Sequence, residues 1–315
     1  MTIIFFGSDD FSIPALEACL ESNHRVLLVV TTPDQKRGRG LKLTPTPVRI
    51  YAGENCLDVV APEKLKDPVL LAKAASLKPD LFVVSAYGKF IPSAWLKIPS
   101  KLALNVHPSL LPKYRGASPV NRPILNGDSE TGVTILEVTD KLDAGDIFAR
   151  ERVPLGERTD AEKLSQELAE LSARMLRTVL PQVESGTLKR IPQRDQDSTY
   201  ADKLTKEEGR LSLNDSARSL ERKIRGLKPW PGSYIPFENE LLHLLEAEPL
   251  DKRVPQKPGT LLTVERDGSM TLATGDGVLK VLRVKPAGKK EMNAADFVRG
   301  RRLAPGYVFE NLQKH

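Results

Sequence analysis

Short apolar runs that alternate with helix-like stretches fill the first 185 residues, and this alternation constrains the fold more than any other feature of the sequence. Five short apolar runs are candidates for buried strands: 2–6, 25–32, 81–85, 102–106 and 132–138, of which 25–32 and 81–85 are β-branched runs. Three stretches have the apolar spacing of a helix: 12–20, 66–77 and 160–185. Strands and helices in alternation predict an α/β fold, a Rossmann-like and mainly parallel sheet with helices on both faces.

The last third of the chain has a different pattern. Residues 189–208 are polar and have no apolar period, so we expect a linker there. A short helical stretch at 216–227 is followed by several short alternating runs, which glycine and proline turns separate. This pattern predicts a small β-barrel or sandwich, and with it two domains, at residues 1–188 and 209–315.

Basic residues are in excess mainly in the last third of the chain. Residues 201–315 contain 21 Lys and Arg against 16 Asp and Glu, whereas residues 1–200 contain 26 against 25. A local surplus of this kind suits contact with a polyanion, and a chance imbalance on a solvated surface accounts for it equally well.

Several classes of protein do not fit the sequence. No apolar run approaches the roughly 18–20 residues that span a bilayer, and the N-terminal MTIIFFGSDD lacks the basic start of a secretory signal. No GxGxxG or Walker motif follows a predicted strand, which argues against a nucleotide cofactor. The cysteines, Cys19 and Cys56, and the four scattered histidines fit no metal-binding spacing. We therefore expect a cytoplasmic protein without a bound metal.

Polar side chains gather where two of the predicted strands end, which is where parallel sheets bind their ligands. Asn105 and His107 lie two apart on one strand and therefore share a face. An asparagine amide can stabilise a developing oxyanion, and a histidine can transfer a proton near neutral pH. The next predicted strand is followed by Asp140, Asp143 and Asp146, one of which could hold the imidazole. A purely structural histidine explains the spacing about as well.

The stretch NVHPSLLPKYRG, with the later LDAGDI, resembles the 10-formyltetrahydrofolate-dependent formyltransferases. That family has an Asn-x-His-x-Ser-Leu-Leu-Pro signature and, further on, a Leu-Asp-x-Gly turn. The resemblance implies that Asn105 stabilises a tetrahedral oxyanion, that His107 takes part in proton transfer, and that Asp143 orients His107. It also implies 10-formyltetrahydrofolate as the co-substrate.

The same resemblance implies that three segments contact the folate. They are the end of the signature and the segments SAYGKFI and VTDKLD, which would bracket the pterin. The residues concerned are Ser109, Leu110, Leu111, Pro112, Tyr87, Gly88, Phe90, Ile91, Thr139 and Asp140.

The acceptor is implied by other segments. Residues 31–48 resemble a loop typical of the branch of the family that formylates the methionine amino group of initiator tRNA. Residues 199–211, 228–234 and 278–292 resemble the C-terminal domain of that branch, an OB-like β-barrel suited to nucleic acid. The implied tRNA-binding residues are Lys36, Arg37, Arg39, Lys42, Lys285, Lys289 and Lys290, with Arg299, Arg301 and Arg302 nearby. The expected function is therefore formyl transfer for translation initiation, by a monomer.

Three alternatives remain at this point. A sugar-nucleotide formyltransferase or a formyltetrahydrofolate hydrolase domain shares the Asn-x-His core and a second β domain, but the basic loop and the basic last third favour tRNA. An RNA-binding module with an inactive core would not need Asn105, His107 and Asp143 together. A glycinamide ribonucleotide enzyme has no use for residues 209–315.

Overall fold

The computed structural model describes residues 1–37 and 42–309, and the chain divides into two compact units. The first unit consists of Met1–Val120, Glu130–Pro154 and Leu164–Asp202. The second consists of Asn121–Ser129, Leu155–Lys163 and the chain from Lys203 onward. The units thus interleave along the chain, and the consecutive domain boundaries drawn from the sequence remain a prediction.

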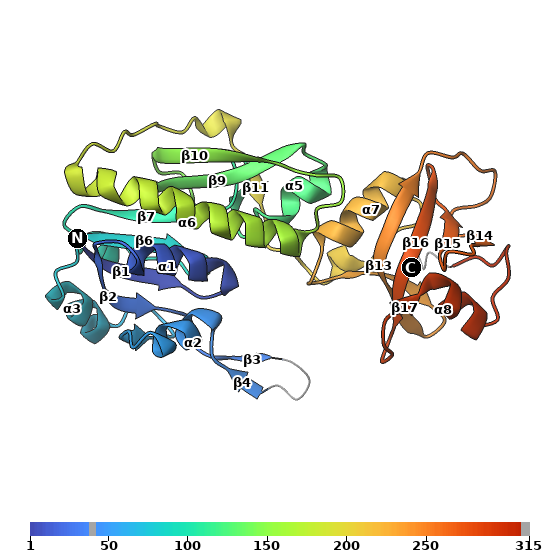
Figure 1. Ribbon diagram of the computed structural model, residues 1–315, viewed down its shortest axis with the longest axis horizontal. Helices are drawn as coiled ribbons and strands as arrows, with labels where there is room; N and C mark the ends of the chain where they lie inside the picture. The colour runs from blue at the N-terminus through green and yellow to red at the C-terminus, as the bar shows by residue number, and fades with distance from the viewer. Residues whose placement is uncertain (38–41, 310–315) are drawn as a thin grey trace. The chain divides into compact units, whose positions relative to one another are not determined.

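A sheet of seven strands forms the centre of the first unit (Figure 1). Its strands are β1 (Thr2–Gly7), β2 (Arg25–Val30), β5 (Val59–Val60), β6 (Leu81–Ser85), β7 (Leu102–His107), β9 (Glu130–Glu137) and β10 (Ile147–Pro154). Their order across the sheet is β10-β9-β7-β6-β1-β2-β5. Strands β5, β2, β1, β6 and β7 run parallel, so the predicted mainly parallel sheet is confirmed.

Helices and short strand pairs connect these strands. The helices are α1 (Ile13–Leu20), α2 (Pro47–Glu54), α3 (Pro68–Ser76), α4 (Ser93–Leu96) and α6 (Ala161–Ser185), and Figure 1 shows the long α6 running along the sheet. The short pairs are β3 (Gln35–Arg37) with β4 (Lys42–Thr44), and β8 (Arg115–Gly116) with β11 (Tyr200–Ala201). Proline lies in the first turn of α1, α2 and α3, where the helix does not need its missing N–H. None of the helices in the described part of the chain is long and apolar enough to cross a membrane.

The central strands are apolar along their whole length because both faces of the sheet are covered. All five residues of β6 are buried, and so are five of the six residues of β1. On one face Phe6 makes edge contacts with Tyr87 and Trp95, with ring centroids 5.5 Å and 5.8 Å away. The Trp95 indole N–H donates to the carbonyl of Leu65 at 2.6 Å, which satisfies its only polar atom.

The order of the strands marks where a ligand is expected. From β1 the chain proceeds to β2 and β5 on one side, and then returns to β6 on the other side of β1. In open α/β sheets, ligands bind at the carboxyl ends of the strands beside such a reversal. Gly7 and Ser85, the last residues of β1 and β6, are neighbours there, and Ser85 pairs in turn with Val106 of β7.

One strand of the seven-stranded sheet runs opposite to its two neighbours. The run 132–138 forms β9, which lies antiparallel to β7, with Leu104 opposite Glu137 and His107 opposite Thr134. The last residue of β9, Glu137, therefore lies beside Leu104, three residues before the carboxyl end of β7. The aspartates that follow β9 belong to a loop that returns to β10, a strand that the sequence reading missed because its outer residues are charged.

The second unit has a core and a sheet of its own. The antiparallel order is β12 (Ser233–Phe237), β13 (Glu240–Leu250), β16 (Val278–Pro286), β15 (Met270–Ala273) and β14 (Leu261–Val264), with β17 (Met292–Asn293) paired to β16. Its helices are α5 (Asn121–Asn126), α7 (Ala217–Gly226) and α8 (Ala294–Gly300). Leu242, Leu244, Val281 and Phe297 are among the residues that fill the core. The expected smaller C-terminal β domain is confirmed.

Residues 189–208, the expected linker, make many hydrogen bonds up to Ala201. Ile191 exchanges two backbone hydrogen bonds with Ile147, at 2.8 Å and 2.9 Å. Tyr200 and Ala201 pair with Arg115 and Gly116 as β11 with β8. This part of the segment is therefore an ordered piece of the first unit, whatever its role in joining the units.

Candidate active site

Three of the predicted residues meet at the end of β7. Asn105 and His107 lie on the same face of β7, and Asp143 reaches both from the loop between β9 and β10. Asn105 Nδ2 donates to Asp143 Oδ1 at 3.1 Å, and His107 Nδ1 lies 3.7 Å from Asp143 Oδ2. The side chains of His107 and Asp143 are only 5% and 8% exposed. This cluster is the candidate catalytic centre.

Of the three aspartates in that loop, the structure selects one. Asp140 accepts a hydrogen bond from Ser93 Oγ, and Asp146 pairs with Arg190 at 3.6 Å. Of these three aspartates, Asp143 is the one that contacts Asn105 and His107 in the described part of the chain.

The imidazole of His107 is held in one orientation. Its Nε2 lies 2.8 Å from the carbonyl oxygen of Tyr114, and because a carbonyl can only accept, Nε2 carries the proton. Nδ1 is then the nitrogen free to exchange a proton, and it faces Asp143. Since 3.7 Å exceeds the length of a hydrogen bond, Asp143 acts on Nδ1 through its charge.

Asp143 is itself held from several sides. Its Oδ2 accepts a hydrogen bond from the backbone N–H of Gly116 at 2.9 Å, so both carboxylate oxygens have a donor. Its backbone has φ 49°, in the left-handed region that only a few per cent of non-glycine residues adopt. Two positions later, a Cβ on Gly145 would lie 2.0 Å from the carbonyl oxygen of Glu137, so only glycine fits there. The Leu-Asp-x-Gly pattern therefore encodes a turn that aims Asp143 at β7.

Sequence reasoning missed the residues that support this cluster. Tyr114 and Gly116 act through backbone atoms, which no side-chain pattern shows. Gln193 contributes an amide from the expected linker and donates to the carbonyl oxygens of Asp143 and Gly145, at 2.9 Å and 2.7 Å. The one available signal was the position of the KYRG turn directly after the signature.

The two segments predicted to bracket a pterin lie side by side. Ser93, just after the first, donates to Asp140 in the second at 2.5 Å. Phe90 and Leu142, one from each segment, are 64% and 63% exposed. Exposed apolar side chains beside polar ones, next to the reversal in strand order, are what a flat heteroaromatic ring would contact.

Of the other residues in the folate prediction, Tyr87 and Ile91 are buried, whereas Gly88 is exposed and Thr139 is half-buried. Tyr87 is 2% exposed, and burial raises the pKa of its hydroxyl to about 12. Ile91 is buried in the same core, Gly88 turns with φ 77°, and Thr139 donates to the carbonyl of Lys141. Any contact between Tyr87 and a ligand at this edge would therefore use its backbone.

Residues 109–112 brace the sheet. Leu111 is fully buried against Leu136 and Ile147, and Pro112 follows it through a cis peptide bond. Thr134 Oγ1 donates to the carbonyl of Ser109 and accepts from the N–H of Leu111, at 2.7 Å and 3.1 Å. Leu110 is half-buried. That these residues contact a folate remains a prediction.

The predicted basic residues fall into two groups, one in each unit. Lys36 and Arg37 lie on β3 and Lys42 on β4, whereas Arg39 lies outside the described residues.

In the second unit, Lys285, Lys289 and Lys290 are exposed at the end of β16 and in the turn that follows it. Arg299 and Arg301 pair with Asp296 and Glu240, at 2.7 Å and 3.0 Å. Within residues 1–37 and 42–309 no three His, Cys, Asp or Glu side chains gather as a metal site requires.

Family models match both units. Residues 1–180 match the model described as formyl transferase, and residues 203–302 match the model of the formyl transferase C-terminal domain. The chain belongs to the formyl transferase family. The resemblance read from the signature is thus confirmed, and it extends over nearly the whole chain.

Relatives within the formyl transferase family match at full length. The methionyl-tRNA formyltransferase of Sulfurihydrogenibium is 38% identical over 311 residues, which cover 98% of this chain and 100% of that protein. The methionyl-tRNA formyltransferases of Halalkalibacterium halodurans and Geobacter metallireducens are 39% and 37% identical, over 95% and 97% of this chain.

Solved structures of more distant proteins share the fold. HypX from Aquifex aeolicus, in complex with tetrahydrofolic acid, has a TM-score of 0.61 at 21% identity, over 94% of this chain and 46% of that one. An N-formyltransferase from Helicobacter canadensis, in complex with folinic acid and dTDP-3-aminofucose, has a TM-score of 0.68 at 18% identity, over 90% and 99%. At such identities the likeness shows the fold alone.

Proposed function

We propose that this protein transfers the formyl group of 10-formyltetrahydrofolate to the methionine amino group of initiator methionyl-tRNA, for translation initiation. The observation that carries the proposal is the full-length identity of 36–39% to methionyl-tRNA formyltransferases, across both units. The cluster of Asn105, His107 and Asp143 supports it, because amide, imidazole and carboxylate are what acyl transfer to an amine requires.

We assign the oxyanion to Asn105. One N–H of its Nδ2 is used by Asp143, so the amide is turned with its nitrogen toward the site and a second N–H remains for the formyl oxygen. A donor fixed in this way costs no reorganisation when charge develops on that oxygen. The folate supplies a formyl group on a nitrogen that leaves once it is protonated.

Proton transfer is assigned to His107. The bond from Nε2 to Tyr114 leaves Nδ1 as the proton acceptor for the attacking amine, and the Asp143 carboxylate at 3.7 Å stabilises the charge that this proton creates. Returning the proton to the departing folate nitrogen completes the transfer. No change in net charge on the enzyme results.

The folate site is proposed at the carboxyl ends of β1, β6 and β7. The exposed side chains of Phe90 and Leu142 and the carboxylate of Asp140 support a ring bound between their segments. Residues 109–112 would then support this site through the packing of Leu111 against Leu136 and Ile147.

Contact with tRNA is proposed for both basic groups. In the second unit Tyr234, His243 and Lys285 lie in register across β12, β13 and β16, with the rings of Tyr234 and His243 5.7 Å apart. Burial, followed by the charge of Lys285, lowers the pKa of His243, which favours the neutral form of this ring. Flat rings beside lysines suit a nucleic acid, since rings contact bases or sugars and lysines neutralise phosphates. Translation takes place in the cytoplasm, where we expect the protein to act as a monomer.

The test is single-turnover formyl transfer to initiator methionyl-tRNA, with elongator methionyl-tRNA as the second acceptor. Wild type should formylate the initiator alone, and His107→Ala should lose on the order of 10²-fold or more of the rate. His24→Ala is the matched control, because His24 precedes β2 at the amino edge of the sheet. Arg39→Ala tests the basic loop and should weaken binding.

A sugar-nucleotide formyltransferase remains the second candidate, since distant structures of that class share the fold. Transfer to an amino sugar nucleotide but to no tRNA would establish it and overturn the proposal.

A further inference from the structure

Gln193 holds the turn that carries Asp143. Its Nε2 donates to the carbonyl oxygens of Asp143 and Gly145, at 2.9 Å and 2.7 Å, so one amide group spans the turn. Asp143 is the residue of that turn with the left-handed backbone, at φ 49°. Backbone in this region persists where the surroundings fix it, and Gln193 supplies that fixation.

Gln193 is in turn held by Arg115. The Oε1 of Gln193 accepts hydrogen bonds from Nη2 of Arg115 at 3.0 Å and from its Nε at 3.3 Å, and Nη1 of Arg115 donates to Asp195 at 3.0 Å. The Arg115 side chain is only 3% exposed. Both the Nε2 donor group and the Oε1 acceptor of the Gln193 side chain are thus hydrogen-bonded, which fixes the orientation of its amide.

The strand that carries Arg115 also supplies the backbone contacts of the active site. Tyr114 accepts from His107, and Gly116 donates to Asp143. This strand is paired with β11, and the N–H of Tyr114 donates to Thr199 Oγ1 at 2.9 Å. Residues 193–201 therefore support the catalytic cluster at two places: Gln193 holds the Asp143 turn, and β11 pairs with β8.

We propose that Gln193 is a positioning residue for formyl transfer, acting on Asp143 through the 143–145 turn. This inference rests on the proposed function for its kinetic part only. Without the amide, the turn loses both of its side-chain contacts from residue 193, and the Asp143 carboxylate is no longer fixed against Asn105 and His107. A displacement of about 1 Å at a catalytic group costs on the order of 10²-fold in rate.

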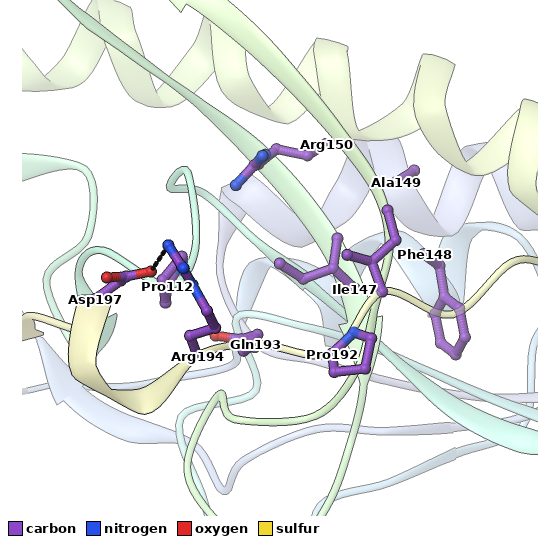
Figure 2. Close-up of a pocket in the computed structure, with 10 residues that line it drawn as sticks. Pro112, Ile147, Phe148, Ala149, Arg150, Pro192, Gln193, Arg194 and Asp197 are labelled. Atoms are coloured by element: carbon purple, nitrogen blue, oxygen red, sulfur yellow. Dashed lines mark ion pairs between the residues drawn. The ribbon is translucent and has the colours of Figure 1, made fainter.

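The matched control is Arg194→Ala. Figure 2 shows Arg194 beside Gln193 along a pocket of about 440 Å³, with its side chain directed at Asp197. The Arg194–Asp197 pair spans 2.6 Å, and the Arg194 side chain is 74% exposed. Exposed pairs of this kind contribute little, so the control changes the same segment and leaves the turn intact.

The first measurement needs no substrate. With the histidines isotopically labelled, NMR observes four sets of imidazole resonances, one of them from His107. Gln193→Ala should shift the His107 resonances, because Asp143 moves relative to Nδ1, whereas Arg194→Ala should leave them in place. Unchanged His107 resonances in a folded Gln193→Ala protein would overturn the inference.

The second measurement is kinetic. Gln193→Ala should lower kcat about 10- to 100-fold while KM for folate and tRNA changes less than about twofold. In a protein that already carries Asp143→Ala, Gln193→Ala should lower kcat by less than about a further twofold, since both substitutions act through the Asp143 carboxylate. Losses that multiply would show a general effect on the fold and overturn the positioning role.

The two proposals fail separately. If wild type formylates initiator tRNA while Gln193→Ala matches Arg194→Ala in kcat, the positioning role is wrong and the function stands. If wild type formylates no tRNA but the His107 resonances shift in Gln193→Ala, the acceptor is wrong and the positioning role stands.

Discussion

Asp143→Asn changes a carboxylate that accepts two hydrogen bonds into a group that can accept on one side only. In the native site Oδ1 accepts from Asn105 at 3.1 Å and Oδ2 from the Gly116 N–H at 2.9 Å. The new side chain keeps one acceptor and presents an NH2 to the other donor. If that NH2 met the Gly116 N–H, an unsatisfied backbone donor would cost about 1–3 kcal/mol.

An arrangement of lower free energy is reached when the side-chain amide of Asn105 rotates. With the oxygen of residue 143 on Gly116, its NH2 faces Asn105, which rotates by half a turn to accept with its own oxygen. Every hydrogen bond is then satisfied, so the free energy of unfolding should fall by less than about 1 kcal/mol. The turned Asn105 amide no longer offers its N–H to the formyl oxygen. Loss of one such donor costs on the order of 10²–10³-fold in turnover, and the lost charge beside His107 adds to this.

The assay combines single-turnover transfer with denaturant unfolding. Asp143→Asn should be nearly as stable as wild type and at least about 10²-fold slower, close to Asn105→Ala. A rate within tenfold of wild type would refute the assignment of the oxyanion to Asn105. A stability loss near 3 kcal/mol would refute the rotation of the amide instead.

Three further changes test other parts of the molecule. Replacing the three lysines of residues 285–290 by alanine should reduce the salt dependence of tRNA binding, so that the slope of log K against log salt concentration decreases in magnitude by about 2–3. An unchanged slope would exclude this turn from the interface. Tyr87→Phe should raise the free energy of unfolding by up to about 1 kcal/mol, because the buried hydroxyl of Tyr87 has no hydrogen-bond partner in the described part of the chain. Chemical denaturation measures this free energy, and a decrease on substitution would contradict the prediction. A hydrogen bond from the Thr2 N–H lowers the pKa of Asp80 below 3.8, so the ionised carboxylate stabilises the fold at neutral pH and this contribution is lost as the pH falls through the lowered pKa. The difference in Tm between wild type and Asp80→Asn should therefore be present at pH 7 and vanish in strong acid.

The elements that the sequence predicted well are those with a dense apolar pattern. Strand 81–85 and the helix at 160–185 were placed within a residue of β6 and α6, because burial on two faces or along one stripe leaves a regular signal. β10 was missed, since its residues 150–152 are exposed and charged. The direction of β9 was not predicted, because a strand between two loops carries no mark of its orientation.

The candidate site was predictable only in its side chains. Asn105 and His107 share a face by the geometry of a strand, and the resemblance named Asp143, whose carboxylate lies within 3.7 Å of both side chains. The atoms that hold them come from backbone groups and from Gln193, fifty positions beyond Asp143. Contacts over such distances follow from tertiary packing, which neither spacing nor periodicity encodes.

The pairing of β8 with β11 has a consequence for the order in which the protein is made. The two strands join residues 85 positions apart, as Tyr114 and Thr199 are. On the ribosome, Asn105, His107 and Asp143 leave the exit tunnel well before Thr199 and Ala201. A nascent chain at that stage contains the three side chains of the candidate catalytic centre but not the strand that fixes Tyr114 and Gly116. Formyl transfer should therefore begin only once synthesis has passed well beyond Ala201, and shorter ribosome-bound fragments should be inactive.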